Sequence, residues 1–206
     1  MPMLYYALGV AEVALMVVAL CAGLVVAALV GRETEAFAGD CPLGGQVIWT
    51  SLINFELSAN EGTRCWYISY INAVGAALGF VLGLYRLITL CCGRFDFAIL
   101  RIVRIPLYSA MAIMTMSAAA VLSHGLNAFC DGLRSQQIQT TNYDCELFQQ
   151  VDWHIYDGSG FYEDFIKAEA SGWVSFLAWA SLTAVAVLSC IAERPQSGFP
   201  LPNNAK

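Results

Sequence analysis

Four long apolar segments, separated by polar stretches, dominate the order of hydrophobic and polar residues along the chain. Each is long enough to cross a hydrocarbon layer about 30 Å thick, because a helix that rises about 1.5 Å per residue does so in about 20 residues. A segment in lipid must satisfy its own backbone N–H and C=O groups, so each segment is predicted to be a helix. The predicted spans cover approximately residues 4–30, 67–92, 100–126 and 168–192.

The sequence therefore predicts an all-α integral membrane protein, a four-transmembrane-helix bundle with two disulfide-braced extracellular or luminal loops. A single membrane domain covers residues 1–192, and residues 193–206 form a short tail. The loops cover residues 31–66 and 127–167, and a short connector covers residues 93–99. The composition agrees with this class, since 58% of the residues are hydrophobic, 13% are charged and the mean hydropathy is +0.61.

Basic residues near the span ends predict the orientation, because cytosolic loops carry an excess of Lys and Arg. Arginines surround the connector, whereas the two longer loops are rich in Asp and Glu. The connector is therefore predicted to be cytosolic, and an even number of spans places both termini on that side. The first segment is too long for a signal-peptide core and lacks a basic start, so it is predicted to remain as a span. The arginines in and around the connector are Arg86, Arg94, Arg101 and Arg104, and the one acid there is Asp96.

Half of the cysteines fall in the loops predicted to face the oxidising side. They are Cys41, Cys65, Cys130 and Cys145. Four cysteines allow three pairings, and we favour Cys41–Cys65 with Cys130–Cys145 because each pair lies within one loop. A zinc site is the weaker alternative, since the spacing is not of the Cys-x-x-Cys type.

The other cysteines fall within spans or at their predicted cytosolic ends. Cys91, Cys92 and Cys190 lie at the membrane edge, where S-palmitoylation is common, whereas Cys21 lies within the first span. We predict palmitoylation at the first three positions, with unmodified thiols as the alternative.

Glycines line one side of the second span. Gly75, Gly79 and Gly83 follow one another at intervals of four residues, a pattern that lets another helix approach closely. The stripe predicts packing inside the four-helix bundle, and the alternative is a face for a dimer or a partner helix.

Two charged residues lie inside the predicted spans. Glu12 in the first span and Arg86 in the second are at similar depth, because the two spans run in opposite directions. An ionisable residue in a membrane is a candidate for function. A structural ion pair, or snorkelling of the side chains to the interface, is nevertheless favoured over an ion path, since the middle of the spans carries few polar groups.

Aromatic residues mark the predicted ends of the spans, as is typical of membrane interfaces. One set, Trp66, Tyr67, Tyr70 and Trp173, lies at outer ends, and Tyr5, Tyr6 and Tyr108 lie at inner ends.

A turn at Asp157–Gly160 is predicted to precede the fourth helix, which then starts outside the membrane. There Phe161 and Phe165 lie on one helix face and are predicted either to cap the bundle or to present a protein-binding surface. For an outer surface that binds a partner, the favoured residues are Phe161, Tyr162 and Trp173.

Candidate catalytic residues are few. The chain has two histidines, His124 and His154, and no spacing typical of a catalytic triad, a metalloprotease or a phosphate loop. The net charge of −6 disfavours nucleic-acid binding. We therefore predict a protein that is not an enzyme, with no cofactor and no bound metal.

Several motifs occur in a fixed order along the chain. The first loop contains Phe37-Ala-Gly-Asp-Cys41-Pro-Leu, Cys65 precedes the second span, and residues 168–174 read Ala-Glu-Ala-Ser-Gly-Trp-Val. Over roughly residues 5–192 the sequence resembles the transmembrane protein 179 family, most closely its B-type members. The resemblance implies a four-span protein with luminal cysteines, no established enzymatic activity, and residence in plasma or secretory granule membranes.

Small four-span proteins with braced outer loops commonly act through partners, an analogy of architecture alone. The favoured hypothesis is an accessory or scaffold subunit of a larger channel, transporter or receptor, embedded in membrane lipid. A self-assembling channel or transporter subunit is the first alternative. A junction or vesicle-type protein with homotypic contacts is the second, and a homo-oligomer is compatible with each.

Overall fold

The computed structural model describes residues 2–43, 45–50, 55–57, 62–92, 98–135, 144–150, 153 and 156–192. Some sequence-based predictions concern residues outside this set. They are the tail at 193–206, the connector residues Arg94 and Asp96, the residue His154, and the side chains of Tyr5 and Arg101.

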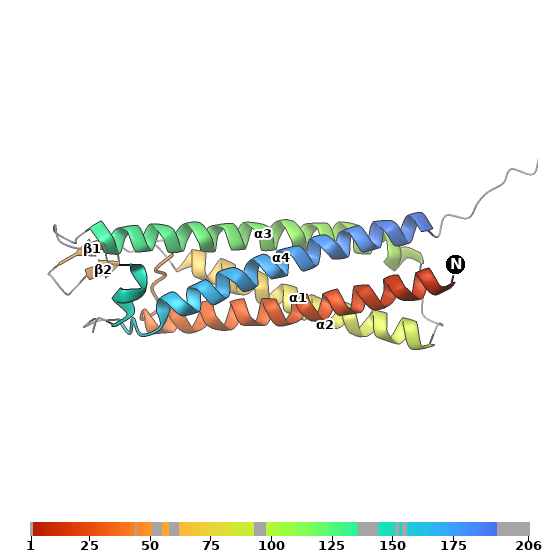
Figure 1. Ribbon diagram of the computed structural model, residues 1–206, viewed down its shortest axis with the longest axis horizontal. Helices are drawn as coiled ribbons and strands as arrows, with labels where there is room; N and C mark the ends of the chain where they lie inside the picture. The colour runs from red at the N-terminus through yellow and green to blue at the C-terminus, as the bar shows by residue number, and fades with distance from the viewer. Residues whose placement is uncertain are drawn as a thin grey trace, which may run out of the picture.

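The predicted four-helix architecture is confirmed. The helices are α1 (Pro2–Ala36), α2 (Thr63–Cys92), α3 (Ala98–Ser135) and α4 (Phe161–Ala192), and each contains a stretch long and apolar enough to cross a membrane. Figure 1 shows them side by side in an elongated bundle, with the N-terminus at one end and two short strands at the other.

All four helices extend beyond their predicted apolar segments at the end that carries the strands. This end also carries both disulfides, and we call it the disulfide end. A polar residue ends the apolar segment but does not break the backbone hydrogen-bond ladder of a helix, so the helices continue past it. The protein therefore presents a folded head above the spans.

α1 packs against α2 on one side and α4 on the other, α3 packs mainly against α4, and α2 and α3 pack against each other less extensively. Two glycines let α1 and α2 approach closely. A Cβ atom at Gly23 would lie 2.8 Å from the Asn72 carbonyl oxygen, and one at Gly79 would lie 3.3 Å from the Met16 carbonyl oxygen. The pairing of these helices thus depends on residues without side chains.

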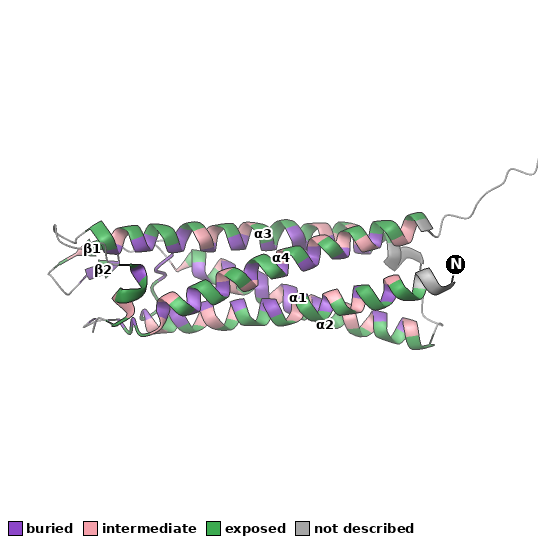
Figure 2. Cartoon of the chain, in the orientation of Figure 1, coloured by how far each residue is buried: buried purple, intermediate pink, exposed green. Residues whose placement is uncertain are grey.

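Large side chains fill the middle of the bundle. Met16, Tyr108, Met111, Trp179 and Leu182 belong to one buried cluster, which we call the bundle core. Buried residues lie on the inward faces of the helices and exposed residues on the outward faces (Figure 2). This distribution is expected for helices whose outer faces contact lipid.

The head contains a small antiparallel sheet and a short 3₁₀ helix. Strands β1 (Val47–Trp49) and β2 (Phe55–Leu57) pair with Ile48 opposite Glu56, and η1 covers Cys145–Gln150. Neither strand is expected from the sequence, since each has three residues. The disulfides are Cys41–Cys65 and Cys130–Cys145, which are the favoured pairings.

Aromatic rings form the centre of the head. Phe37 lies at its middle, with ring centroids 5.4 Å from Tyr156 and 5.8 Å from Phe129. Phe55 lies 5.0 Å from Trp153, and Phe161 lies 5.3 Å from Trp153. We call this cluster the head core, and its members are Phe37, Phe55, Phe129, Trp153, Tyr156 and Phe161. Edge-on and tilted contacts of this kind add to the stability gained from burial.

A turn places the first residue of α4 in the head core. The Ser159 backbone N–H donates to Asp157 Oδ1 at 3.0 Å, and Gly160 adopts a positive φ of 82°. Side chains with a Cβ atom disfavour that conformation, so Gly160 suits the chain reversal before Phe161. The predicted turn at 157–160 and the start of the fourth helix outside the apolar segment are both present.

Candidate functional site

A cluster of charged residues lies inside the bundle near the end opposite the disulfides. Glu12 of α1 is 1% exposed, and its Oε2 lies 2.6 Å from Arg86 Nη2 of α2. Its Oε1 lies 2.8 Å from Arg104 Nη1 of α3 and accepts a hydrogen bond of 2.9 Å from the Tyr108 hydroxyl. We call these four residues the Glu12 cluster. It joins three helices through one carboxylate.

The helical spacing of α3 explains two of these contacts. Arg104 and Tyr108 are four residues apart, so they lie on the same face and both reach Glu12. The Tyr108 ring also packs against Trp179 of α4, with centroids 5.8 Å apart. The cluster therefore contacts the bundle core, and through it the fourth helix.

Each charged residue of the Glu12 cluster depends on its partners for stability inside the bundle. A charge in a low-dielectric interior is stable only when it is paired and hydrogen-bonded, and removing one partner leaves the other uncompensated. Both carboxylate oxygens of Glu12 are engaged by cationic or hydroxyl donors. The geometry supports the expected ion pair of Glu12 with Arg86 and gives it a role in fixing the helices.

Two interpretations of the sequence need correction here. Arg104 was grouped with the arginines around the cytosolic connector, but its side chain is 9% exposed and binds Glu12. Tyr108 was assigned to the aromatic belt at an inner interface, yet it is 0% exposed. Their spacing could have predicted both positions. Residues four apart lie on the same helix face, and a buried Glu12 needs donors on the helices around it.

The glycines of α2 that were candidates for binding a partner lie inside the bundle. The glycine stripe faces the interior: Gly75 lies against Met111 and Trp179, and Gly83 lies against Met16. Packing within the bundle thus accounts for Gly75, Gly79 and Gly83.

At the disulfide end, Phe161 is 0% exposed, so of its two predicted roles it caps the bundle and does not lie on an outer surface. The reason is that the loops fold over it to complete the head core. Tyr162 is half-buried. Trp173 is 38% exposed, and its Nε1 donates to Ser123 Oγ at 3.3 Å. Of the three residues, Trp173 presents the most clearly exposed side chain.

A second set of buried charges ties α1 to α4 at the disulfide end. Glu33 is 2% exposed and Asp164 is 5% exposed, and both contact the Arg32 guanidinium. Nearby, Ser123 of α3 donates to Glu169 of α4 at 2.6 Å. These contacts join neighbouring helices just below the head. Like the Glu12 cluster, these contacts hold helices together, but Glu33 Oε2 has no hydrogen-bond partner among the described residues.

The remaining cysteines are thiols. Cys21, Cys91 and Cys92 are exposed and Cys190 is partly exposed. Exposure is compatible with acylation at Cys91, Cys92 and Cys190, which stays a prediction.

Comparison with known proteins decides the family. The family model for the transmembrane protein 179/179B claudin domain matches residues 8–203. The chain belongs to the transmembrane protein 179/179B family. Human transmembrane protein 179B is 25% identical over an alignment of 186 residues, which covers 88% of this chain and 83% of that protein. No solved structure is significantly similar to the chain. The family is a claudin-like family of four-span membrane proteins and not a known enzyme family.

Proposed function

We propose that this chain is a non-enzymatic accessory or scaffold subunit that binds a larger membrane protein through its head. The observation that supports this most is the exposure of large apolar side chains outside the spans. Ile48 on β1 is 52% exposed and Leu147 on η1 is 42% exposed. Lipid covers exposed apolar residues on the helices, but it does not reach residues of the head.

Acidic residues surround these two side chains. Glu56 is the cross-strand neighbour of Ile48, Glu146 precedes Leu147, and both glutamates are exposed. An apolar side chain beside a carboxylate suits a partner surface that carries apolar and basic residues. We therefore favour the extracellular or luminal domain of a membrane protein as the partner.

The construction of the head also favours binding. Two disulfides and the aromatic head core hold β1 and η1 in place before any partner arrives. A preorganised surface loses less conformational entropy on binding than a mobile loop does. The disulfides also suit an oxidising compartment, so we place this end outside the cell or in a secretory lumen, with both termini cytosolic.

The interior of the bundle gives less support to a channel or transporter. Both oxygens of Glu12 are engaged within the chain, and large side chains fill the bundle core. A transport pathway needs polar groups that a substrate can reach. The exposed apolar side chains of the head also fit a second candidate, a protein that makes homotypic contacts through its head.

The test is co-purification of the full chain from native membranes, followed by size-exclusion chromatography and mass spectrometry. Ile48→Ala and Leu147→Ala should release a stoichiometric membrane protein that travels with the original chain. Ile113→Ala and Leu177→Ala are matched controls, because these residues are 63% and 59% exposed on helices. The controls should retain the partner.

Two results would reject the accessory role. One is recovery of the chain alone at monomer mass. The other is a partner that stays bound to all four variants equally. A homo-oligomer that dissociates in the two head variants would instead establish the homotypic alternative.

A further inference from the structure

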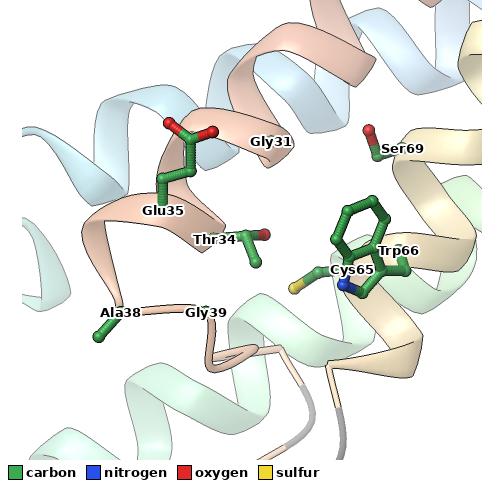
Figure 3. Close-up of a pocket in the computed structure, with 8 residues that line it drawn as sticks. All are labelled: Gly31, Thr34, Glu35, Ala38, Gly39, Cys65, Trp66 and Ser69. Atoms are coloured by element: carbon green, nitrogen blue, oxygen red, sulfur yellow. The ribbon is translucent and has the colours of Figure 1, made fainter.

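A pocket of about 540 Å³ lies between α1 and α2 at the disulfide end, a size within the usual range of small-molecule sites. Figure 3 shows its two walls, one from the end of α1 and the turn after it, the other from the start of α2. We call it the α1–α2 pocket. Its lining residues are Gly31, Thr34, Glu35, Ala38, Gly39, Cys65, Trp66 and Ser69.

Fixed contacts border the pocket on two sides. Toward the middle of the bundle, Ser69 Oγ donates to the Ala27 carbonyl oxygen at 3.1 Å and joins the two helices. Toward the head, the Cys41–Cys65 disulfide joins the turn after α1 to α2. Between these ties the α1 wall is open at Gly31, where an added Cβ atom would meet nothing within 4 Å. The space is therefore a built feature of the helix ends.

The polar groups of the lining are chiefly acceptors. The Thr34 hydroxyl donates to the Val30 carbonyl oxygen at 2.7 Å, and the Ser69 hydroxyl donates to α1, so both oxygens can still accept. The Glu35 carboxylate makes no hydrogen bond or ion pair with any described residue. This set of groups suits a ligand that is positively charged.

An aromatic ring completes the cation-binding chemistry. Trp66 is 69% exposed on the α2 wall, and Glu35 lies on the α1 wall with its carboxylate turned away from the indole (Figure 3). Because Glu35 is exposed, its side chain can rotate toward a ligand in the pocket. An indole face attracts a cation through its quadrupole, and quaternary ammonium groups are commonly recognised in this way. A carboxylate on one wall and an indole on the other provide both parts of an ammonium site.

The surface below the pocket indicates where that ammonium group comes from. Exposed residues run down α2 from the pocket at intervals of four and three residues, which places them on one helix face. They are Trp66, Tyr70, Ala73, Ala77 and Phe80. On a transmembrane helix such a face contacts acyl chains. The charge of the pocket and its continuity with this stripe together favour a lipid over a soluble cation.

We propose that the α1–α2 pocket binds the ammonium headgroup of a zwitterionic phospholipid, a choline or ethanolamine lipid of the leaflet at the disulfide end. Glu35 pairs with the ammonium group and the Trp66 ring packs against it. The acyl chains lie along the exposed stripe of α2. This site is independent of the partner surface formed by Ile48 and Leu147.

Native mass spectrometry of the full chain in detergent tests the proposal. The chain is titrated with phosphatidylcholine, phosphatidylethanolamine and phosphatidylglycerol that carry the same acyl chains. The two zwitterionic lipids should bind about fivefold or more tightly than the anionic one. Glu35→Gln and Trp66→Leu should each weaken phosphatidylcholine binding by about fivefold or more. Glu56→Gln and Trp173→Leu, which change exposed residues outside the pocket, should leave binding unchanged.

Folding is checked for each variant by its thermal unfolding midpoint. If Trp66→Leu lowers the midpoint, Trp66→Phe replaces it and should bind choline lipid with intermediate strength, since it keeps a smaller aromatic face. Glu35→Lys should reverse the preference toward phosphatidylglycerol. Equal binding of the three lipids would overturn the proposal, as would phosphatidylcholine binding that is the same in the pocket variants and the controls.

Discussion

The contacts of the Glu12 cluster predict how much each of its residues contributes to the free energy of unfolding. Glu12→Ala removes the acceptor shared by Arg86, Arg104 and the Tyr108 hydroxyl. Breaking a buried ion pair by removing one partner costs about 3–5 kcal/mol, because a buried charge is left uncompensated. We expect Glu12→Ala to lower the free energy of unfolding by an amount in this range. Arg104→Ala should lower it by less, because Glu12 keeps its ion pair with Arg86 and its hydrogen bond from Tyr108. Tyr108→Phe removes only a hydroxyl and should cost about 0.6 kcal/mol, and at most about 1.7 kcal/mol.

The double variant is the decisive member of the series. With Glu12 and Arg104 both replaced by alanine, neither charge remains to be compensated by the other. The loss should therefore be smaller than the sum of the two single losses by about 0.5–3 kcal/mol. The assay is equilibrium unfolding by SDS in mixed micelles, followed by circular dichroism. Thr115→Ala is the control, since the hydroxyl of buried Thr115, among the residues that the structure describes, donates only to carbonyl oxygens of its own helix, at Met111 and Ala112.

Two outcomes would contradict this account of the cluster. Single variants that lose no more than the Thr115 control would show that the pairs contribute little to stability. Losses that add within about 0.5 kcal/mol would show that Glu12 and Arg104 do not act on each other.

Three further predictions follow from other parts of the structure. Gly23→Ala places a Cβ atom 2.8 Å from the Asn72 carbonyl oxygen and should lower the thermal midpoint, whereas Gly31→Ala meets nothing within 4 Å and should leave it unchanged or raise it. Phe161→Ala should cost about 3–5 kcal/mol in SDS unfolding because it opens a cavity in the head core, and half-buried Tyr162→Ala should cost clearly less. Acyl exchange on protein from native membranes should label Cys91, Cys92 and Cys190, and triple replacement by serine should abolish the label.

The sequence predicted the parts of the fold that depend on local composition. Four apolar segments define four helices in lipid, and two cysteines in each loop define two disulfides. Glu12 and Arg86 could be paired because two antiparallel spans place them at the same depth. Each of these inferences needs only the order of residue types along the chain and the thickness of a membrane.

The parts that the sequence did not predict depend on contacts between distant segments. β1 and β2 have three residues each, too few for an alternating pattern to identify them. Phe161 faces inward because segments from both loops pack over it. The sequence around Phe161 does not indicate these contacts. Arg104 is close to the basic connector in the sequence, and its charge therefore counts toward the predicted cytosolic side of the membrane. In the structure, its position on the face of α3 directs the side chain inward to Glu12 instead.

The two ends of the bundle are held by different interactions, and their independence can be measured. The Glu12 cluster joins α1, α2 and α3 near one end, while Cys130–Cys145 joins α3 to η1 at the other. Replacing both cysteines by serine should cost about 3 kcal/mol for a loop closed over 15 residues. Combined with Tyr108→Phe, the losses in SDS unfolding should add within about 0.5 kcal/mol, because the sites share no partner. A clear departure from additivity would instead mean that α3 couples the head to the buried charges. In that case a partner bound at Ile48 and Leu147 would alter the packing of the helices. The head would then transmit binding to the membrane spans as well as attach the partner.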